Sequence, residues 1–342
     1  MNDLNKILDD DEKVKLLLKQ NNLPKALPLF FSNQKVSWQL LKEGCKSLES
    51  VKLKKIDFDN FTIILQYNPR RIYSALAKID NDSIKERKCF LCIENLPSGQ
   101  KAILNHEKYL ILCNPFPIFK QHFTIPHINH TAQKIKNNFS DMLCLAKDFS
   151  HSYNVFYNGP KCGASAPDHL HFQAGERFFL PIENEFSSLK KMLGQKLIQN
   201  KNIEINSIDD TLRRFFTIEG KDENLIIKFF DLIYNSFKKV AKKKEEPPLN
   251  IISSYEEKKG YRIIIFLRRK HRPSHFYKEG NKRVILSPGV IDLGGVCILP
   301  IKKDFEQMTR QTLQDIFNEV TISQKNFTEL NRLLQNEISK IF

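Results

Sequence analysis

The chain has 342 residues, about twice the usual size of one domain, which indicates either two domains or one internally duplicated unit. Its composition, 41% hydrophobic and 27% charged residues, is typical of a globular protein and excludes extended disorder. The net charge of +15 suggests polyanionic partners such as nucleic acid, acidic lipid or phosphorylated small molecules, unless the surplus is only a solvated surface.

The N-terminal segment and the cysteines predict a soluble, cytoplasmic protein. Residues 1–15 are polar and mixed in charge, without the apolar core or the cleavage site of a signal peptide. No apolar run approaches the ~18 residues of a membrane helix, so we expect no membrane partner. The odd number of cysteines, seven, suits a reducing compartment, where cysteine is a buried hydrophobe or a metal ligand.

The first half of the chain predicts helices followed by strands. The first 50 or so residues have helical patterning, and an amphipathic helix with an apolar face is expected over 140–152. β-Branched and aromatic runs closed by turn residues predict strands between and after these helices. The expected strands are 58–67, 108–113, 122–126 and 154–157.

The second half of the chain begins with a change in residue composition. Residues 185–244 are rich in Leu, Phe and Lys at helical spacing, and the lysine-rich run before Pro247-Pro248 predicts a helix exit or linker. Strands are then expected at 249–255, 261–267, 282–286 and 295–301, with helix after residue 304. We therefore predict an N-terminal catalytic half (1–186), a helical insertion or linker (187–246) and a related C-terminal half (247–342).

The most informative segment is GASAPDHLHFQAG, residues 163–175. In an extended strand alternate residues share a face, so His169, His171 and Gln173 would point the same way. A neutral imidazole can act as a nucleophile towards phosphorus, and an amide donor beside it could hold a non-bridging oxygen. The alternative interpretations are a structural histidine pair and a metal site on a strand.

A CxxC pair, Cys89 and Cys92, is the second candidate site. In a cytosolic chain it could be a redox pair, part of a zinc site or a coincidence. His127 and His130 follow beyond the strand at 122–126, and two thiolates with two imidazoles would complete a tetrahedral zinc site. The long gap excludes a compact finger, so such a zinc ion would connect several parts of a larger fold.

Two basic clusters are candidates for binding phosphate. In LRRKHRPSHFY, alternation would put Arg268, Lys270 and Arg272 on one face, which suits a diphosphate or a sugar phosphate. Arg70 and Arg71 form a second candidate patch; for either, the alternative is a solvated basic turn. Neither cluster is interleaved with the stacking aromatics of a single-strand groove, so nucleic acid is a disfavoured partner.

The segments NPFPIF, HFTIP and YNGPKCGASAPDHLHFQ together resemble the histidine-triad superfamily. The resemblance is closer to its transferase branch: galactose-1-phosphate uridylyltransferases, diadenosine tetraphosphate phosphorylases and GDP-L-galactose phosphorylases. The hydrolase branch has a third histidine where this chain has Gln173. A longer set of motifs, which includes CFLC and SPGVIDLGGVCILP, resembles an uncharacterised bacterial family related to these enzymes. The motifs cover about residues 68–175, and the C-terminal half resembles a second, degenerate repeat.

The resemblance implies a role for each residue that matches the motifs. His171 would be the nucleophile that becomes covalently nucleotidylated, Gln173 would bind and orient the α-phosphate, and Ser165 would contact a phosphate. The nucleotide site would also include Asn114, Asn158 and Gly163.

The resemblance also implies a structural zinc ion. In the uridylyltransferases a CxxC, a later histidine and the first histidine of HxHxQ bind zinc. Cys89, Cys92 and His169 match three of these ligands. We predict His130 as the fourth, with His127 as the alternative.

The sequence thus predicts an α+β fold, a histidine-triad-like antiparallel sheet with flanking helices, as two related halves in one chain. The expected activity is that of a nucleotidyltransferase or phosphorylase acting on a nucleoside diphosphate sugar through nucleotidyl-His171. It would release sugar 1-phosphate, with phosphate or a second sugar 1-phosphate as acceptor. The alternatives are a dinucleoside polyphosphate phosphorylase and a zinc-stabilised basic nucleic-acid- or nucleotide-binding protein without catalysis. We expect a monomer or a homodimer.

Overall fold

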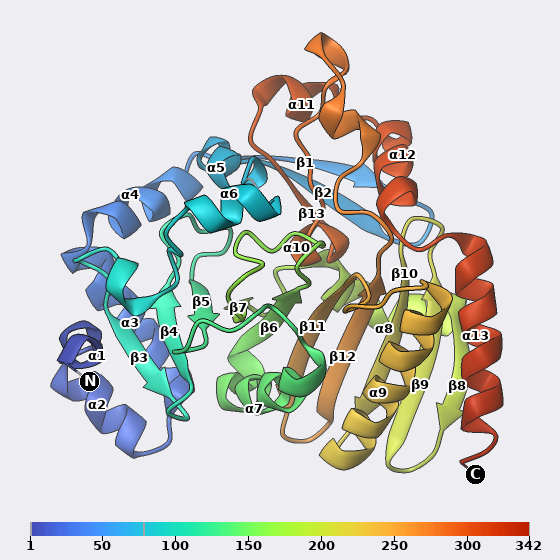
Figure 1. Ribbon diagram of the computed structural model, residues 1–342, viewed down its shortest axis with the longest axis horizontal. Helices are drawn as coiled ribbons and strands as arrows, with labels where there is room; N and C mark the ends of the chain where they lie inside the picture. Colours follow the sequence, from blue (N-terminus) through green and yellow to red (C-terminus); the bar gives the residue numbers. More distant parts are fainter. Residues whose placement is uncertain (1, 78, 342) are drawn as a thin grey trace.

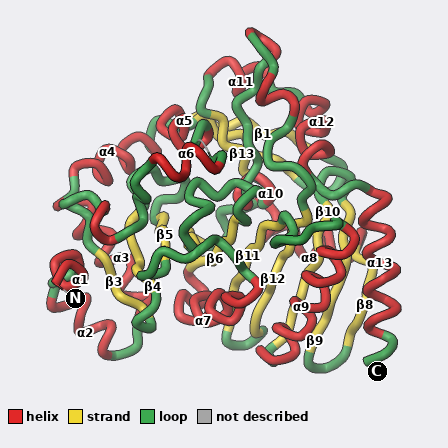
Figure 2. The backbone as a smooth tube through the Cα atoms, in the orientation of Figure 1, coloured by secondary structure: helices red, strands yellow, loops and turns green. Residues whose placement is uncertain are grey.

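The computed structural model describes residues 2–77 and 79–341. Ten strands form one antiparallel sheet that runs across the whole molecule (Figures 1 and 2). In chain order they are β3 (Ala102–Asn105), β4 (Tyr109–Cys113), β5 (His122–Pro126), β6 (Tyr153–Asn158), β7 (His171–Glu176), β8 (Gly194–Gln199), β9 (Ile203–Asp209), β10 (Arg214–Gly220), β11 (Leu249–Glu256) and β12 (Gly260–Leu267). Their order in the sheet is β3-β4-β5-β7-β6-β11-β12-β10-β9-β8.

The two halves of this sheet have the same topology. From the outer edge to the centre, each half contains its first, second, third, fifth and fourth strands. A helix connects the third strand to the fourth in both, α7 (Phe139–Phe149) in one and α9 (Glu223–Val240) in the other. The halves meet at the antiparallel pair β6–β11, where Tyr157 faces Ile251. The predicted fold class of two related halves around an antiparallel sheet is therefore confirmed.

The prediction of a helical insertion over 187–246 was wrong. Only the end of α8 (Pro181–Leu193) and α9 are helical there, and between them lie β8, β9 and β10. In β9, buried Ile203 and Ile205 alternate with the half-buried Glu204, which is the period of a strand, and the frequent Lys and Phe hid this alternation. The second half of the fold thus begins at β8, well before Pro247-Pro248.

Helices cover both faces of the sheet (Figure 2). The face that carries Phe172 and Ala174 packs against α3 (Leu23–Ser37), α7, α9 and α13 (Gln324–Ile338). The opposite face, with Phe156 and Ile252, packs against α8, α12 (Arg310–Val320) and a small second sheet. Because Phe172 is buried on the first face, its neighbours His171 and Gln173 point towards the second.

The second sheet joins a segment from the first quarter of the chain to one from the last quarter. β1 (Lys52–Asp57) pairs with β2 (Thr62–Tyr67), and β2 pairs in parallel with β13 (Val296–Leu299). This brings α10 (Val290–Leu293) against β6 and β11, near the start of β7. The remaining helices are α1 (Asn2–Ile7), α2 (Glu12–Lys19), α4 (Gln39–Leu48), α5 (Ile72–Ala75), α6 (Asn81–Glu86) and α11 (Lys302–Gln307).

The strand expected over 282–286 is a loop. Its backbone N–H groups do not pair with a neighbouring strand: Val284 donates to the His275 carbonyl, in a short 3-10 helix, and Ile285 to the Asp304 carboxylate. The predicted N-terminal and C-terminal helices are confirmed, as is the strand predicted over 295–301, which is β13. None of the described helices has the length and apolarity needed to cross a membrane.

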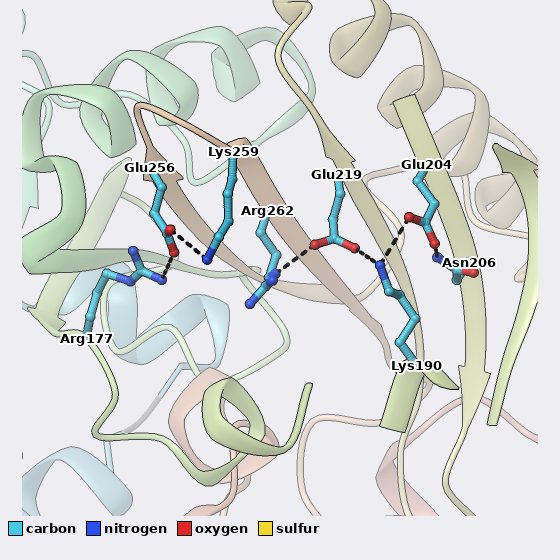
Figure 3. Close-up of polar contacts among 8 residues, drawn as sticks. All are labelled: Arg177, Lys190, Glu204, Asn206, Glu219, Glu256, Lys259 and Arg262. Atoms are coloured by element: carbon cyan, nitrogen blue, oxygen red, sulfur yellow. Dashed lines mark hydrogen bonds and ion pairs between the residues drawn. The ribbon is translucent and has the colours of Figure 1, made fainter. Parts of the chain in front are cut away.

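A row of ion pairs crosses from the first half of the sheet to the second (Figure 3). Arg177, just after β7, pairs with Glu256 of β11 at 2.9 Å. Further along, Glu219 of β10 pairs with Arg262 of β12 and with Lys190 of α8, and Lys190 also reaches Glu204 of β9. These half-buried contacts fix α8 across the strands of the second half.

Candidate active site at the start of β7

The backbone of His171 is held by a buried glutamine. Gln133 accepts a hydrogen bond from the His171 N–H (2.8 Å) and donates to the His171 carbonyl (3.0 Å) and the Asn158 carbonyl (2.9 Å). Gln133 thereby takes the place of a neighbouring strand where β6 and β7 diverge. No sequence pattern indicated this role, because Gln133 lies in a loop 38 residues before His171.

The side chain of His171 is oriented by the backbone. Its Nδ1 lies 2.8 Å from the carbonyl oxygen of His169, and since a carbonyl only accepts, Nδ1 carries the proton. Burial lowers the pKa of His171 to about 4, which keeps the ring neutral. Nε2 therefore carries the free lone pair, and the ring lines a cavity of 390 Å³.

Gln173 lies on the same face and is oriented by His122. The Ile118 N–H donates to Nδ1 of His122 (3.4 Å), so the proton is on Nε2, which donates to the side-chain oxygen of Gln173 (3.0 Å). The amide NH₂ of Gln173 is left to face the cavity. Burial, followed by the charge of Arg71, lowers the pKa of His122 to about 3, so this histidine stays neutral.

The 390 Å³ cavity, named here the large cavity, is mostly apolar. Tyr73, Phe90 and Phe116 are among its walls, with Arg71, Ser165 and Gln173 at its polar end. Asn114 also lines it, but its amide is engaged within the protein: it donates to Thr124 and accepts from the Phe116 N–H.

A small cavity of 90 Å³ adjoins the large one, and Arg71, Ser165 and Gln173 line both. Asn158 and Gly163 line the small cavity from the first half of the sheet, and Arg272 lines it from the second. Gly163 has φ +101°, and a Cβ there would lie 3.0 Å from Cα of Gly289, so the loop before β7 needs glycine at this point.

Three of the predicted phosphate-binding residues lie elsewhere. Arg70 pairs with Glu43 on the surface (3.3 Å), and the exposed side chain of Lys270 pairs with Glu319. Arg268 is fully buried, and all five of its N–H groups donate to protein oxygens. The prediction failed because β12 ends at Leu267, so strand alternation does not continue through residues 268–272.

The structure brings four predicted metal ligands together. The ligand atoms of Cys89, Cys92, His130 and His169 all lie within 4.8 Å of one another. Nδ1 of His169 is 3.3 Å from the Cys89 sulfur, and Nδ1 of His130 is 3.2 Å from the Cys92 sulfur. These separations suit ligands around one tetrahedral ion, so the cluster could hold a metal ion.

Neighbouring groups orient the histidines of this cluster. Nε2 of His169 donates to the carbonyl of His127 (2.7 Å), and Nε2 of His130 lies 3.5 Å from the carboxylate of Asp168. Such partners turn the opposite nitrogen towards a metal. The ring of His127 packs against Tyr109 instead, so His127 contributes only its carbonyl.

Two family models match most of the chain between them. Residues 30–176 match "Domain of unknown function (DUF4922)", and residues 186–341 match "GDPGP1-like, C-terminal domain". The search of curated proteins found no match. Among solved structures, yeast Ap4A phosphorylase Apa2 with AMP has a TM-score of 0.54 at 14% identity, covering 83% of this chain and 97% of that one. The same enzyme with Ap4A has a TM-score of 0.50 at 14% identity, covering 85% and 98%.

The structural likeness shows a shared fold over nearly the whole of the yeast chain. With the family model of the C-terminal half, it confirms the resemblance to the transferase branch of the histidine-triad superfamily. The narrower bacterial family stays a prediction.

Proposed function

We propose, from the likeness to the transferase branch of the histidine-triad superfamily and from the geometry around His171, that this protein is a nucleotidyl-transferring enzyme. Its substrate is a nucleoside diphosphate sugar, and its intermediate is a nucleotide bound to Nε2 of His171. The observation that carries the proposal is the hydrogen bond from Nδ1 of His171 to the His169 carbonyl, because it leaves Nε2 unprotonated on a ring that lines the large cavity.

The reaction runs in two displacements. Nε2 attacks the α-phosphorus, the bond to the bridging oxygen breaks, and sugar 1-phosphate leaves. An oxygen of phosphate, or of another sugar 1-phosphate, then attacks the same phosphorus and breaks the P–N bond. The Gln173 NH₂ and the Ser165 hydroxyl donate to the non-bridging oxygens, where charge accumulates in both transition states. Arg71 balances that charge from the wall that the two cavities share.

The nucleoside occupies the large cavity. Tyr73, Phe90 and Phe116 offer aromatic faces for a base, and Asn114 supports the wall near the ribose. Zn²⁺ would be held by Cys89, Cys92, His130 and His169, where its role is to fix the loops around His171 in place. That role follows from His169, because its ring is a proposed metal ligand and its backbone carbonyl accepts the hydrogen bond from Nδ1 of His171.

A second substrate, a dinucleoside polyphosphate, is favoured by one observation. The Ap4A phosphorylase fold is matched over 97% of its length, so both halves of that enzyme have counterparts here. The chemistry at His171 is the same, and only the leaving group differs.

The test uses radiolabelled nucleotides. Incubation with a panel of nucleoside diphosphate sugars and dinucleoside polyphosphates should give a labelled protein adduct, which phosphate discharges as nucleoside diphosphate. His171→Ala should abolish the adduct, whereas the surface variant His151→Ala should form it normally. Absence of an adduct in the wild-type protein with every donor would overturn the proposal. Salt-dependent nucleic-acid binding that survives His171→Ala would then favour a binding protein.

A further inference from the structure

The CxxC turn belongs to two sites at once. Cys89 and Cys92 are two of the four proposed metal ligands. The residues between them, Phe90 and Leu91, line the large cavity. Leu91 is only 5% exposed and packs with the two cysteines and Ala166, whereas Phe90 is 47% exposed. The metal cluster and part of the cavity wall are therefore one short turn, in which Phe90 is the residue held least by packing.

Arg87 contacts the exposed ring of Phe90. Its guanidinium carbon lies over the ring, 5.3 Å from the centroid. A guanidinium at this separation is attracted by the negative face of an aromatic ring. Arg87 itself lies outside the lining of the large cavity, so its effect on a ligand there has to pass through Phe90.

Asp168 connects Arg87 to the metal cluster. One of its carboxylate oxygens accepts a hydrogen bond from Arg87 at 2.6 Å, and the other lies 3.5 Å from Nε2 of His130. The side chains of Arg87 and Asp168 are only 24% and 17% exposed, so solvent weakens this ion pair less than an open surface pair. Nδ1 of His130 faces the Cys92 sulfur at 3.2 Å. Asp168 thus contacts a metal-cluster ring with one oxygen and the partner of Phe90 with the other.

These contacts form a closed loop of side chains. It runs from the metal cluster through His130, Asp168 and Arg87 to Phe90, and the backbone of the CxxC turn leads from Phe90 back to the cluster. A metal ion in the cluster and an aromatic ring stacked on Phe90 would stabilise the same arrangement of this loop. Two ligands that favour one arrangement raise each other's affinity by the same factor.

We propose that Arg87 and Asp168 are positioning residues that couple the metal cluster to the binding of a nucleobase against Phe90. The inference rests on the proposed function, which puts the nucleoside in the large cavity. It adds that the metal ion affects how tightly the nucleotide binds, in addition to holding the loops around His171.

The first measurement is a double-mutant cycle on nucleotide affinity. Zinc-loaded wild-type protein, Arg87→Ala, Phe90→Ala and the double variant are titrated calorimetrically with AMP, GMP, CMP and UMP. Phe90→Ala should raise the dissociation constant of the bound nucleotide about 5- to 150-fold, the range for losing one stacked ring. Arg87→Ala should raise it about two- to fivefold, the range for an exposed cation–π contact. In the double variant Arg87→Ala should add nothing, because the ring through which it acts is gone.

Arg310→Ala is the matched control. Arg310 also combines an ion pair, with Asp59 at 2.9 Å, and a position over an aromatic ring, 4.8 Å from the centroid of Phe58. All three residues lie outside the lining of the large cavity, so Arg310→Ala should leave the dissociation constant unchanged.

The second measurement follows zinc in competition with a chelator. Asp168→Asn should lower the zinc affinity about 10- to 100-fold, because His130 loses a partner that orients it. The bound nucleotide should raise the zinc affinity of the wild-type protein. In Asp168→Asn the rise should be smaller, with the nucleotide at the same multiple of each protein's dissociation constant.

Three results would overturn the inference: additive effects of Arg87→Ala and Phe90→Ala, an equal effect of Arg310→Ala, or an equal rise in zinc affinity in wild type and Asp168→Asn. Nucleotide binding with the expected coupling but no labelled adduct would overturn only the proposed function. Wild-type protein that binds none of the four nucleotides would overturn both.

Discussion

The amide of Gln173 has two chemically different ends, and only the NH₂ end can donate to a phosphate oxygen. The structure selects that end through His122, whose own tautomer is set by the Ile118 N–H. The sequence resemblance implied a role for Gln173 but none for His122, the first residue of HFTIP. The contact spans 51 residues, so no local pattern could have revealed it.

Replacing His122 by alanine should lower kcat strongly and change KM for the nucleotide little. Without the N–H donor, the Gln173 amide can rotate and present its oxygen to the phosphate. Loss of one donor to a developing oxyanion costs about 10²–10³ in rate. His122→Asn retains an N–H donor and should recover part of kcat. Steady-state kinetics on both variants checks this, and a folded alanine variant with kcat within about threefold of wild type would contradict it.

At the scale of elements, Arg268 joins β11, β12 and the loop before β7. Its guanidinium donates to Asn250 and to the carbonyls of Pro288 and Val320, and the Asn250 amide in turn donates to Asn158 and to the Cys162 carbonyl. Through this chain of buried hydrogen bonds the second half holds the loop that carries Ser165.

Arg268→Lys should therefore destabilise the protein by about 2–4 kcal/mol, because a lysine ammonium cannot reach five oxygens and leaves buried carbonyls unpaired. Denaturant unfolding measures the change in free energy of unfolding. Lys270→Ala removes only a surface ion pair and should cost less than about 1 kcal/mol. Equal effects of the two substitutions would show that the buried network is not stabilising.

Glu246 connects the end of α9 to the segment that carries Gln133. Its carboxylate accepts the Ile135 N–H (2.6 Å) and the Tyr157 hydroxyl (2.5 Å). Burial raises the pKa of Glu246 to about 7, and the hydrogen bonds together with Lys134 offset this only in part. The folded state thus keeps a proton that the unfolded state has already lost above about pH 4.5.

Stability should consequently fall as the pH rises from about 4.5 to about 7, by at most about 3 kcal/mol from this group. Glu246→Gln carries no titrating proton and should flatten that part of the profile. Urea midpoints at several pH values in this range test it. Glu245→Gln, whose side chain is 82% exposed, should retain the wild-type slope. Parallel profiles for wild type and Glu246→Gln would rule out this source of pH dependence.

For the whole molecule, sequence patterns predicted what is locally encoded. Strand alternation in HLHFQ predicted that His171 and Gln173 share a face of the sheet. Turn residues marked where most strands of the first half end. The misassigned segments were of two kinds. In β9 the composition concealed the strand periodicity. At Arg268 a side chain expected to face a phosphate is buried within the protein instead.

The net charge of +15 also has a clearer meaning. Of the five basic residues expected to face phosphates, only Arg71 and Arg272 line the cavities. Arg268 is a buried connector, and Arg70 and Lys270 form surface ion pairs. A compact phosphorylated substrate needs no more than these few cations.

The matching topology of the two halves has a consequence for stoichiometry. In the first half, β6 and β7 are joined by residues 159–170, the loop that carries Ser165, whereas β11 and β12 are joined by the short turn 257–259. An ancestor assembled from two identical copies of this unit would have had two equivalent centres. Shortening one of the loops leaves a single centre, so each polypeptide should take up one nucleotidyl group and no second. The second half, which has only the short turn at this point, instead contributes Arg272 to the lining of the small cavity.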